Sequence, residues 1–402
     1  MDPLSNQGMR TPLTVIAVLF VVLVGIAIAF EDDDAPGTPA PRPAAPVDEI
    51  ARRVEAIRHV RFKELPDPVA VTPAQAKDEA LEDLDRRYPP ERRRADEALY
   101  KTLGLIDPDA DLRDLTGSLF EQGVAGYYDS RDGRLRVVKG AGTGNRVISE
   151  ITLAHELDHA LEDQQFEFED PTTSDDRALA YTALLEGSAT ALMGDYLLRH
   201  FTGEEALGSL LGSSLQDTGD LPPFLQAQVL FPYLDGEAFV ADLRRRAGDR
   251  WDLVDTALRL RPPESTEQVL HPDAYFDAEE AKPVRLRAGK ALGPSWKRAT
   301  AGTWGELQTR ELLALAGGNS REAAAGWGGD RYELWQSAAE NVLVMRWRWD
   351  TLRDQNEFRA ALLEWAGSKL PKDRYAVEAT ADGVTLVVGP DLDTISRVMR
   401  LG

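Results

Sequence analysis

The chain of 402 residues contains no cysteine and only five histidines. The absence of cysteine excludes disulfides, thiol nucleophiles and cysteine-bound zinc, so histidine and carboxylate remain as the strong metal ligands. Because histidine is scarce, two histidines at a chemically meaningful spacing carry weight as a motif.

Positive charge is also in short supply, with 46 basic against 68 acidic residues and a formal net charge of -22. A nucleic-acid partner requires a basic face, so the composition argues against one. The hydrophobic fraction of 43% is that of a folded globular protein. The length exceeds what one hydrophobic core usually supports, so we expect a main domain over residues 48–282 and a smaller one over 283–402.

A long apolar run extends from Leu13 to Phe30 and can just cross a bilayer as a helix. Arg10 precedes this run and four acidic residues follow it, which predicts a signal anchor with residues 1–12 in the cytoplasm. A cleaved signal peptide is the alternative, because Ala27-Ile28-Ala29 fits a small-x-small cleavage pattern. Both interpretations place the main body outside the cytoplasm. Residues 31–47 contain five prolines and predict an extended tether.

The strongest motif is the H-E-x-x-H pentad formed by His155, Glu156 and His159. It lies in a segment, 146–166, that is predicted to be helical, so the two imidazoles point the same way one turn apart. Two such imidazoles can hold a zinc ion, and Glu156 beside them is placed to deprotonate a metal-activated water.

A catalytic zinc takes three protein ligands and leaves one position open. The metzincin pattern requires glycine and histidine three and six residues after the second histidine, where this chain has Glu162 and Gln165. The third ligand is therefore expected from a second helix, predicted over 177–201. Glu186 is the only carboxylate between Ala178 and Gly194.

A lone buried charge such as Glu186 is costly without a positive partner, and we predict that this partner is the metal. Pairing with an arginine is the alternative. The small residues Gly187, Ser188 and Ala189 are expected to let the two metal helices approach each other.

Ligating imidazoles are usually held through their other ring nitrogen by a carboxylate. Asp163, one turn beyond His159, is the first candidate for this role, and Asp158 and Asp195 are alternatives.

The pentad with Glu186 on a later helix resembles the gluzincin arrangement of thermolysin-like zinc peptidases. More closely, the chain resembles a family of poorly characterised bacterial envelope metallopeptidases. The matching pieces are Gly126–Asp129, Ala154–Gln164, Leu185–Thr190 and Ser265–Pro272. The resemblance implies one zinc ion per chain, bound by His155, His159 and Glu186, with Glu156 as the general base. Thr190 stands where thermolysin-like enzymes have an aspartate that orients a histidine, so that role does not carry over.

Two alternating segments around a turn at 129–133 predict a β-hairpin over 123–138. In zincin peptidases an edge strand upstream of the metal helix binds the substrate backbone, and an ordinary sheet strand is the alternative here. His271 could stabilise the oxyanion of the reaction, or it could be a turn histidine bonded to backbone. Tyr127 and Tyr128 are the other candidates for the oxyanion.

The glycine-rich segment 140–145 invites a dinucleotide-loop interpretation, but Asn145 replaces the third glycine of that motif, and we predict no nucleotide. The apolar segment 222–239, which includes Tyr233, is expected to be core rather than the wall of a substrate pocket.

After residue 283 the alternation of Leu343, Met345, Trp347 and Trp349 with Val344, Arg346 and Arg348 predicts a strand with one fully apolar face. A helix around 358–367, a hairpin across 381–383 and a final helix from 392 complete a predicted antiparallel α+β unit. Thr72 followed by Pro73 predicts the start of an earlier helix that continues to Tyr88.

Together these features predict an α+β protein with a mainly helical, zincin-like domain. We expect a membrane-anchored zinc endopeptidase that acts on peptide or protein substrates. The first alternative is a non-catalytic envelope protein in which zinc only joins two helices and the C-terminal unit binds a partner. The second is zinc-dependent hydrolysis of another bond, because fold does not fix substrate.

Overall fold

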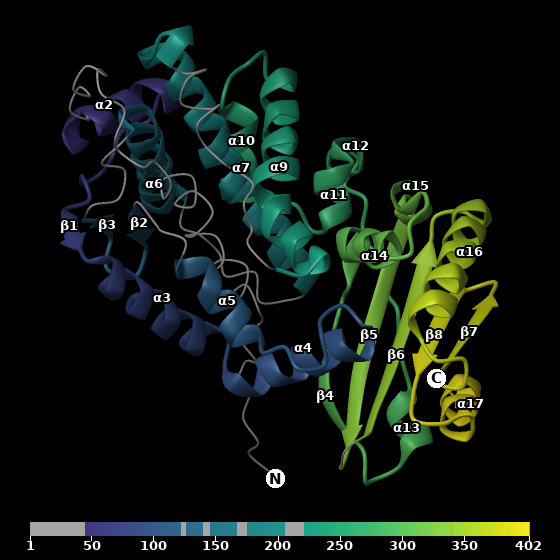
Figure 1. The fold of residues 1–402 in the computed structure, drawn as a ribbon. Coiled ribbons are helices and arrows are strands. Elements are labelled where there is room, and N and C mark those ends of the chain that lie inside the picture. The colour runs from purple at the N-terminus through teal and green to yellow at the C-terminus, as the bar shows by residue number, and fades with distance from the viewer. Residues whose placement is uncertain are drawn as a thin grey trace, which may run out of the picture.

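The computed structural model describes residues 45–121, 126–139, 145–166, 175–205, 221–338 and 340–401 (Figure 1). The predicted cytoplasmic N-terminus, the anchor at 13–30, most of the tether and the glycine-rich residues 140–144 lie outside these ranges. Among the described residues, no helix combines the length and the apolar character needed to cross a membrane.

The α+β class is confirmed: helices predominate and two separate sheets are present. The first part of the chain forms α2 (Val47–Arg58), β1 (Pro68–Val71), α3 (Pro73–Arg87), α4 (Pro90–Thr102) and α5 (Leu112–Glu121). The predicted helix start at Thr72 is confirmed by a capping box, in which Thr72 and Gln75 each bond the other's backbone N–H.

The smaller sheet has three strands in the order β1-β3-β2. The predicted hairpin is confirmed as β2 (Gly126–Asp129) paired antiparallel with β3 (Arg134–Val138). β1 adds to the other side of β3 in parallel, a pairing that the sequence pattern did not indicate. β2 therefore forms an edge of this sheet, and it packs beside α6.

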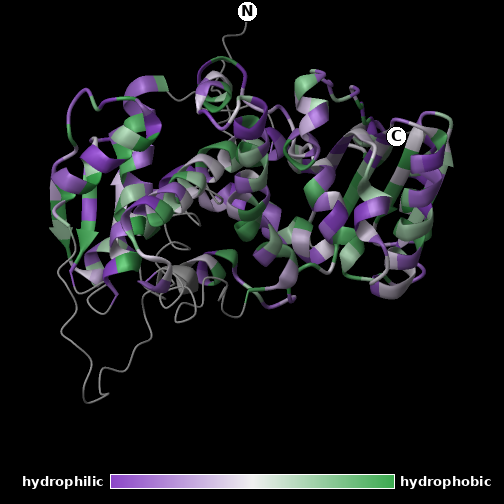
Figure 2. Ribbon diagram, turned by 90° about the horizontal axis from the view of Figure 1, so that it is seen from above, coloured by the Kyte–Doolittle hydropathy of each residue, from purple (hydrophilic) through white to green (hydrophobic). Residues whose placement is uncertain are grey.

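Four helices make up the central layer of the molecule: α6 (Arg146–Phe166), α7 (Asp175–His200), α9 (Pro223–Arg246) and α10 (Asp252–Leu260). The first two agree with the predicted metal helices. α6 is buried on nearly all sides, and its buried residues include five acidic or basic groups beside the apolar ones. Hydrophilic and hydrophobic residues accordingly alternate along the central helices (Figure 2).

α7 and α9 approach each other through glycine. A Cβ on Gly187 would lie 2.2 Å from the carbonyl oxygen of Gly236, and one on Gly236 would lie 2.2 Å from that of Ala183. Gly187 therefore faces α9, and the expectation that it brings the two metal helices together is wrong. Ser188 does face α6, since its hydroxyl donates to Glu162 at 2.5 Å.

The C-terminal part contains a five-stranded antiparallel sheet in the order β4-β5-β6-β8-β7 (Figure 1). Its strands are β4 (Lys297–Gly302), β5 (Trp327–Ser337), β6 (Glu340–Trp349), β7 (Tyr375–Thr380) and β8 (Gly383–Val388). Seven helices of the described residues accompany it: α11 (Thr266–Leu270), α12 (Pro272–Phe276), α13 (Ala288–Leu292), α14 (Gly305–Ala314), α15 (Ser320–Ala324), α16 (Leu352–Lys369) and α17 (Leu392–Leu401).

The predicted apolar face of β6 packs under α14 and α16, through Leu343, Met345 and Trp347. The opposite face contributes Val342 and Val344 to a second cluster with α13 and α17. The tryptophans of this region are thus mainly core residues.

The sheet is joined to the helical layer at the N-terminal end of α7. Asp176 accepts bonds from the backbone N–H and the hydroxyl of Thr266, and that hydroxyl oxygen also accepts from the N–H of Leu307. α11 therefore connects α7 with α14.

Candidate metal centre

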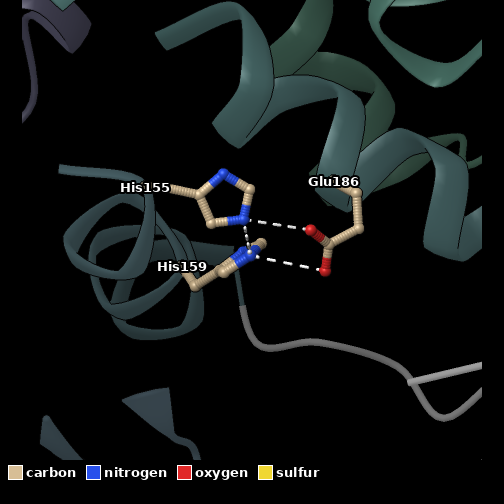
Figure 3. A group of neighbouring side chains, drawn as sticks. All are labelled: His155, His159 and Glu186. Carbon is tan, nitrogen blue, oxygen red and sulfur yellow. Dashed lines mark hydrogen bonds and ion pairs between the residues drawn. The ribbon is translucent and has the colours of Figure 1, made fainter. Parts of the chain in front are cut away.

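Three side chains from α6 and α7 converge in the way the sequence predicted (Figure 3). The Nε2 atom of His155 lies 3.0 Å from Oε2 of Glu186 and 3.0 Å from Nε2 of His159. His159 Nε2 lies 3.4 Å from the other Glu186 oxygen. The alternative that Glu186 pairs with an arginine is not what the structure shows.

The spacing of the nitrogen and oxygen atoms of these three side chains fits a zinc ion. Zinc binds histidine and carboxylate at about 2.0–2.1 Å, so two corners of its tetrahedron lie about 3.3 Å apart. The three observed separations, 3.0 to 3.4 Å, fall close to that value. Each of the three side chains also offers a lone pair, and three lone pairs that converge require a proton or a cation between them.

The charge of the cluster follows the same logic. Burial disfavours the charged forms, yet Glu186 raises the pKa of His159 to about 10. The two imidazoles in turn overcome the effect of burial and lower the pKa of Glu186 to about 2. In the absence of metal, a proton on His159 therefore offsets the Glu186 charge. A metal ion must displace that proton.

Glu156 lies beside the cluster and is only 4% exposed. Its Oε2 accepts a hydrogen bond of 2.9 Å from the backbone N–H of Tyr128 in β2. Burial raises the pKa of Glu156, while the nearby imidazoles of His155 and His159 act in the opposite direction. A carboxylate that is partly desolvated and fixed in this way suits the role of a general base.

Tyr233 of α9 is a site residue that the sequence analysis assigned to the core. Its ring is stacked on His155, with 6.3 Å between the ring centroids and 29° between the ring planes. Burial and the charges of Glu186 and Glu156 raise the pKa of Tyr233, so its phenol stays protonated at neutral pH. No spacing relates Tyr233 to the pentad, and its only signal was an aromatic side chain with a polar tip in an apolar segment.

A second unpredicted feature is a buried ionic network that ties α2 to both metal helices. Arg58, 2% exposed, donates to Asp158 at 2.6 Å and to Glu162 at 2.7 Å, and it also contacts Ser188 of α7 at 3.3 Å. Its other terminal nitrogen reaches Asp255 of α10. Burial and the Asp158 charge raise the pKa of Glu162 to about 7.

The carboxylates expected to orient the imidazoles have other partners. Asp163 accepts a 2.8 Å bond from the hydroxyl of Tyr128, and Asp158 is paired with Arg58. Asp195 is paired with Arg244 of α9. The assignment of Asp163 to a ligating histidine is therefore not supported. The Nδ1 of His155 is buried and has no hydrogen-bond partner among the described residues.

His271 does not join the metal cluster. Its Nε2 is bonded to Glu306 of α14 at 2.8 Å, which raises the pKa of His271. It follows α11, in which Thr266 contacts Asp176 of α7. Asp176 and Glu186 are ten residues apart on α7, which corresponds to about 15 Å along the helix. The structure thus favours a structural histidine, with a carboxylate rather than backbone as its partner. Of the other oxyanion candidates, Tyr127 donates its hydroxyl to Glu79.

Comparison with known proteins adds one finding. A family model described as a domain of unknown function (DUF8575) matches residues 295–399, which contain the five-stranded sheet and most of α17. No curated protein and no solved structure matches the chain. The metal helices lie outside the matched range.

Proposed function

We propose that this protein is a zinc-dependent metallopeptidase that hydrolyses peptide bonds outside the cytoplasm. The observation that carries the proposal is the convergence of His155, His159 and Glu186 within 3.4 Å, next to the buried carboxylate of Glu156. Three ligands of this type leave a fourth zinc position for water or substrate. The side chain of His159 is 17% exposed, which gives solvent access to the cluster.

Zinc bound by these ligands would supply Lewis acidity, which activates a water molecule and polarises the scissile carbonyl. Glu156 would take a proton from the attacking water and deliver it to the leaving amine. The N–H of Tyr128 holds the Glu156 carboxylate in position for both transfers. The Tyr233 phenol, close to Glu156 and Glu186, would donate to the developing oxyanion.

The substrate backbone is proposed to align along β2. This strand lies at the edge of its sheet and is joined to the general base through Tyr128. An extended peptide can add to such an edge by main-chain hydrogen bonds. A peptide bound in this way would have its scissile bond within reach of Glu156, as an endopeptidase requires.

The location outside the cytoplasm rests on the sequence alone. The apolar run at 13–30, the acidic residues after it and the proline-rich tether are the features of an envelope-anchored protein.

The decisive experiment replaces Glu156 with glutamine. The zinc content, measured by mass spectrometry of the purified full chain, should stay at one per chain. Cleavage of a complex peptide mixture should fall by at least about 100-fold, because the general base is lost. A Glu364→Gln variant, changed on the exposed surface of α16, should cleave normally.

Hydrolysis by Glu156→Gln at the wild-type rate would refute the mechanism. If the wild-type protein binds zinc but no chelator-sensitive cleavage is found, the non-catalytic envelope protein is favoured. Chelator-sensitive hydrolysis of esters or other bonds without peptide cleavage would favour the second alternative.

A further inference from the structure

A second group of carboxylates lies where α11 meets the C-terminal sheet. Glu267 belongs to α11, Glu279 follows α12, and Asp350 lies in the turn between β6 and α16. One oxygen atom from each carboxylate lies within 4.8 Å of the other two. The group shares no residue with the zinc cluster.

Glu267 is the unusual member of this group. Glu267 is 5% exposed, and among the described residues no hydrogen bond or ion pair reaches its carboxylate. Burial and the neighbouring carboxylates of Glu306, Glu279 and Asp350 raise the pKa of Glu267 to about 9. A buried, unpaired carboxylate among like charges is unfavourable unless a proton or a cation compensates it.

The ammonium group of Lys282 lies nearby, but it is paired with Asp350 rather than with Glu267. Lys282 Nζ lies 2.5 Å from Asp350 Oδ1 and 3.0 Å from the carbonyl oxygen of Trp349. One ammonium group thus offsets one of three carboxylates and leaves Glu267 without a partner.

The chemistry of the group selects the cation. Three carboxylate oxygens without nitrogen or sulfur ligands favour a hard cation such as calcium or magnesium over zinc. Calcium accepts six to eight oxygen ligands in flexible geometry, whereas magnesium requires a near-ideal octahedron and usually keeps several waters. Three carboxylates from separate elements, with oxygens within 4.8 Å of one another, therefore fit calcium better. Glu279 and Asp350 are exposed, so water can supply the remaining ligands.

We propose that Glu267, Glu279 and Asp350 form a calcium site that fastens α11 to the turn between β6 and α16. Calcium would displace Lys282 from Asp350 and give Glu267 its missing counter-ion. Because α11 is bonded to α7 through Thr266 and Asp176, the ion would strengthen the junction between the sheet and the helix that carries Glu186. The proposal does not depend on the peptidase function.

The test is equilibrium dialysis of the zinc-loaded full chain against radioactive calcium, after treatment with a calcium-selective chelator. Wild-type protein should bind one calcium per chain, with magnesium at least about tenfold weaker. Glu267→Gln should lose this binding. Glu378→Gln, the same change at an exposed position of β7, should keep it. No bound calcium in the wild type, or equal binding in Glu267→Gln, would overturn the proposal.

Thermal unfolding separates loss of the site from loss of the fold. Saturating calcium should raise the Tm of the wild type by about 3–6 °C and leave that of Glu267→Gln unchanged. Without calcium, Glu267→Gln should melt at or above the wild-type temperature, because the neutral amide needs neither a proton nor a counter-ion among the neighbouring carboxylates. A wild-type Tm that does not respond to calcium would contradict the proposal.

Discussion

Tyr233 links a third helix, α9, to the metal cluster through its contact with His155. It stacks on His155, and burial together with the charges of Glu186 and Glu156 raises its pKa, so the phenol is protonated at neutral pH. A fixed hydrogen-bond donor at this point can stabilise negative charge that develops in the transition state but is absent from the substrate.

We therefore expect Tyr233→Phe to lower kcat about 100-fold while KM and zinc content change little. Steady-state kinetics on a peptide found in the cleavage screen, with metal analysis of the same samples, measures this. Tyr375→Phe, on β7, is the matched control and should behave as wild type. A Tyr233→Phe enzyme with unchanged kcat would exclude the phenol from catalysis.

At the scale of elements, the contact between α7 and α9 decides where Tyr233 lies. Gly236 lies three residues, nearly one helical turn, beyond Tyr233 on α9. A Cβ at Gly236 would lie 2.2 Å from the carbonyl oxygen of Ala183. Two backbones this close cannot accommodate a methyl group without moving apart.

Gly236→Ala should therefore destabilise the protein by about 1–3 kcal/mol and lower activity, because α9 carries Tyr233 away from His155. Urea unfolding and peptide cleavage are the measurements. Gly194→Ala is a sharp control, since a Cβ at that position in α7 has open space around it. It should stabilise the helix by up to about 1 kcal/mol and leave cleavage intact. Equal effects of the two substitutions would refute the close-packing argument.

The attachment of α2 depends on Arg58, which is buried against Asp158, Glu162 and Ser188. Removal of one partner from a buried ion pair leaves the other charge uncompensated, at a cost of about 3–5 kcal/mol. Arg58→Met should lose about that much stability in urea unfolding. Arg52→Met, in the same helix but exposed and paired only with Asp48, should stay within about 0.5 kcal/mol of the wild type. A stable Arg58→Met variant would show that hydrophobic packing alone holds α2.

At the scale of the whole molecule, the junction between the helical layer and the sheet is sensitive to pH. Burial raises the pKa of Asp176 to about 7, although its hydrogen bonds from Thr266 oppose this. The folded-state pKa lies above the unfolded value near 3.8, so the protonated form is favoured in the native state. This contribution to stability is complete below about pH 4 and is lost as pH rises through 7.

Asp176→Asn should remove the loss of stability that accompanies the rise in pH, because the amide stays neutral. Its oxygen can still accept hydrogen bonds from Thr266. The variant should be more stable than the wild type above pH 7, by up to about 4 kcal/mol, and its stability should change less between pH 4 and 8. Urea unfolding across this range, with metal ions held constant, measures the difference. Asp109→Asn, an exposed control, should follow the wild-type profile. A parallel profile for Asp176→Asn would mean that Asp176 is ionised in the native protein throughout.

The sequence by itself determined what depends on neighbours along the chain. The pentad placed His155 and His159 on one face of α6, since a helix brings residues four apart together. Thr72 and Pro73 set the start of α3, and the alternation in β6 set its apolar face. No spacing rule predicts Glu186 as the third ligand. Its role is indicated by its isolation, because a lone carboxylate in an apolar helix requires a positive partner.

Only the tertiary structure decided which distant side chains meet. Arg58 and Ser188 are 130 residues apart, and His271 and Glu306 are 35 apart, so no local periodicity links them. Three further contacts depend on how whole helices pack. Gly187 faces α9 rather than α6, the Tyr128 hydroxyl is bonded to Asp163, and the Tyr233 ring is stacked on His155. Helix packing is fixed by the combined fit of many side chains, and this information is spread over the chain rather than contained in any one motif.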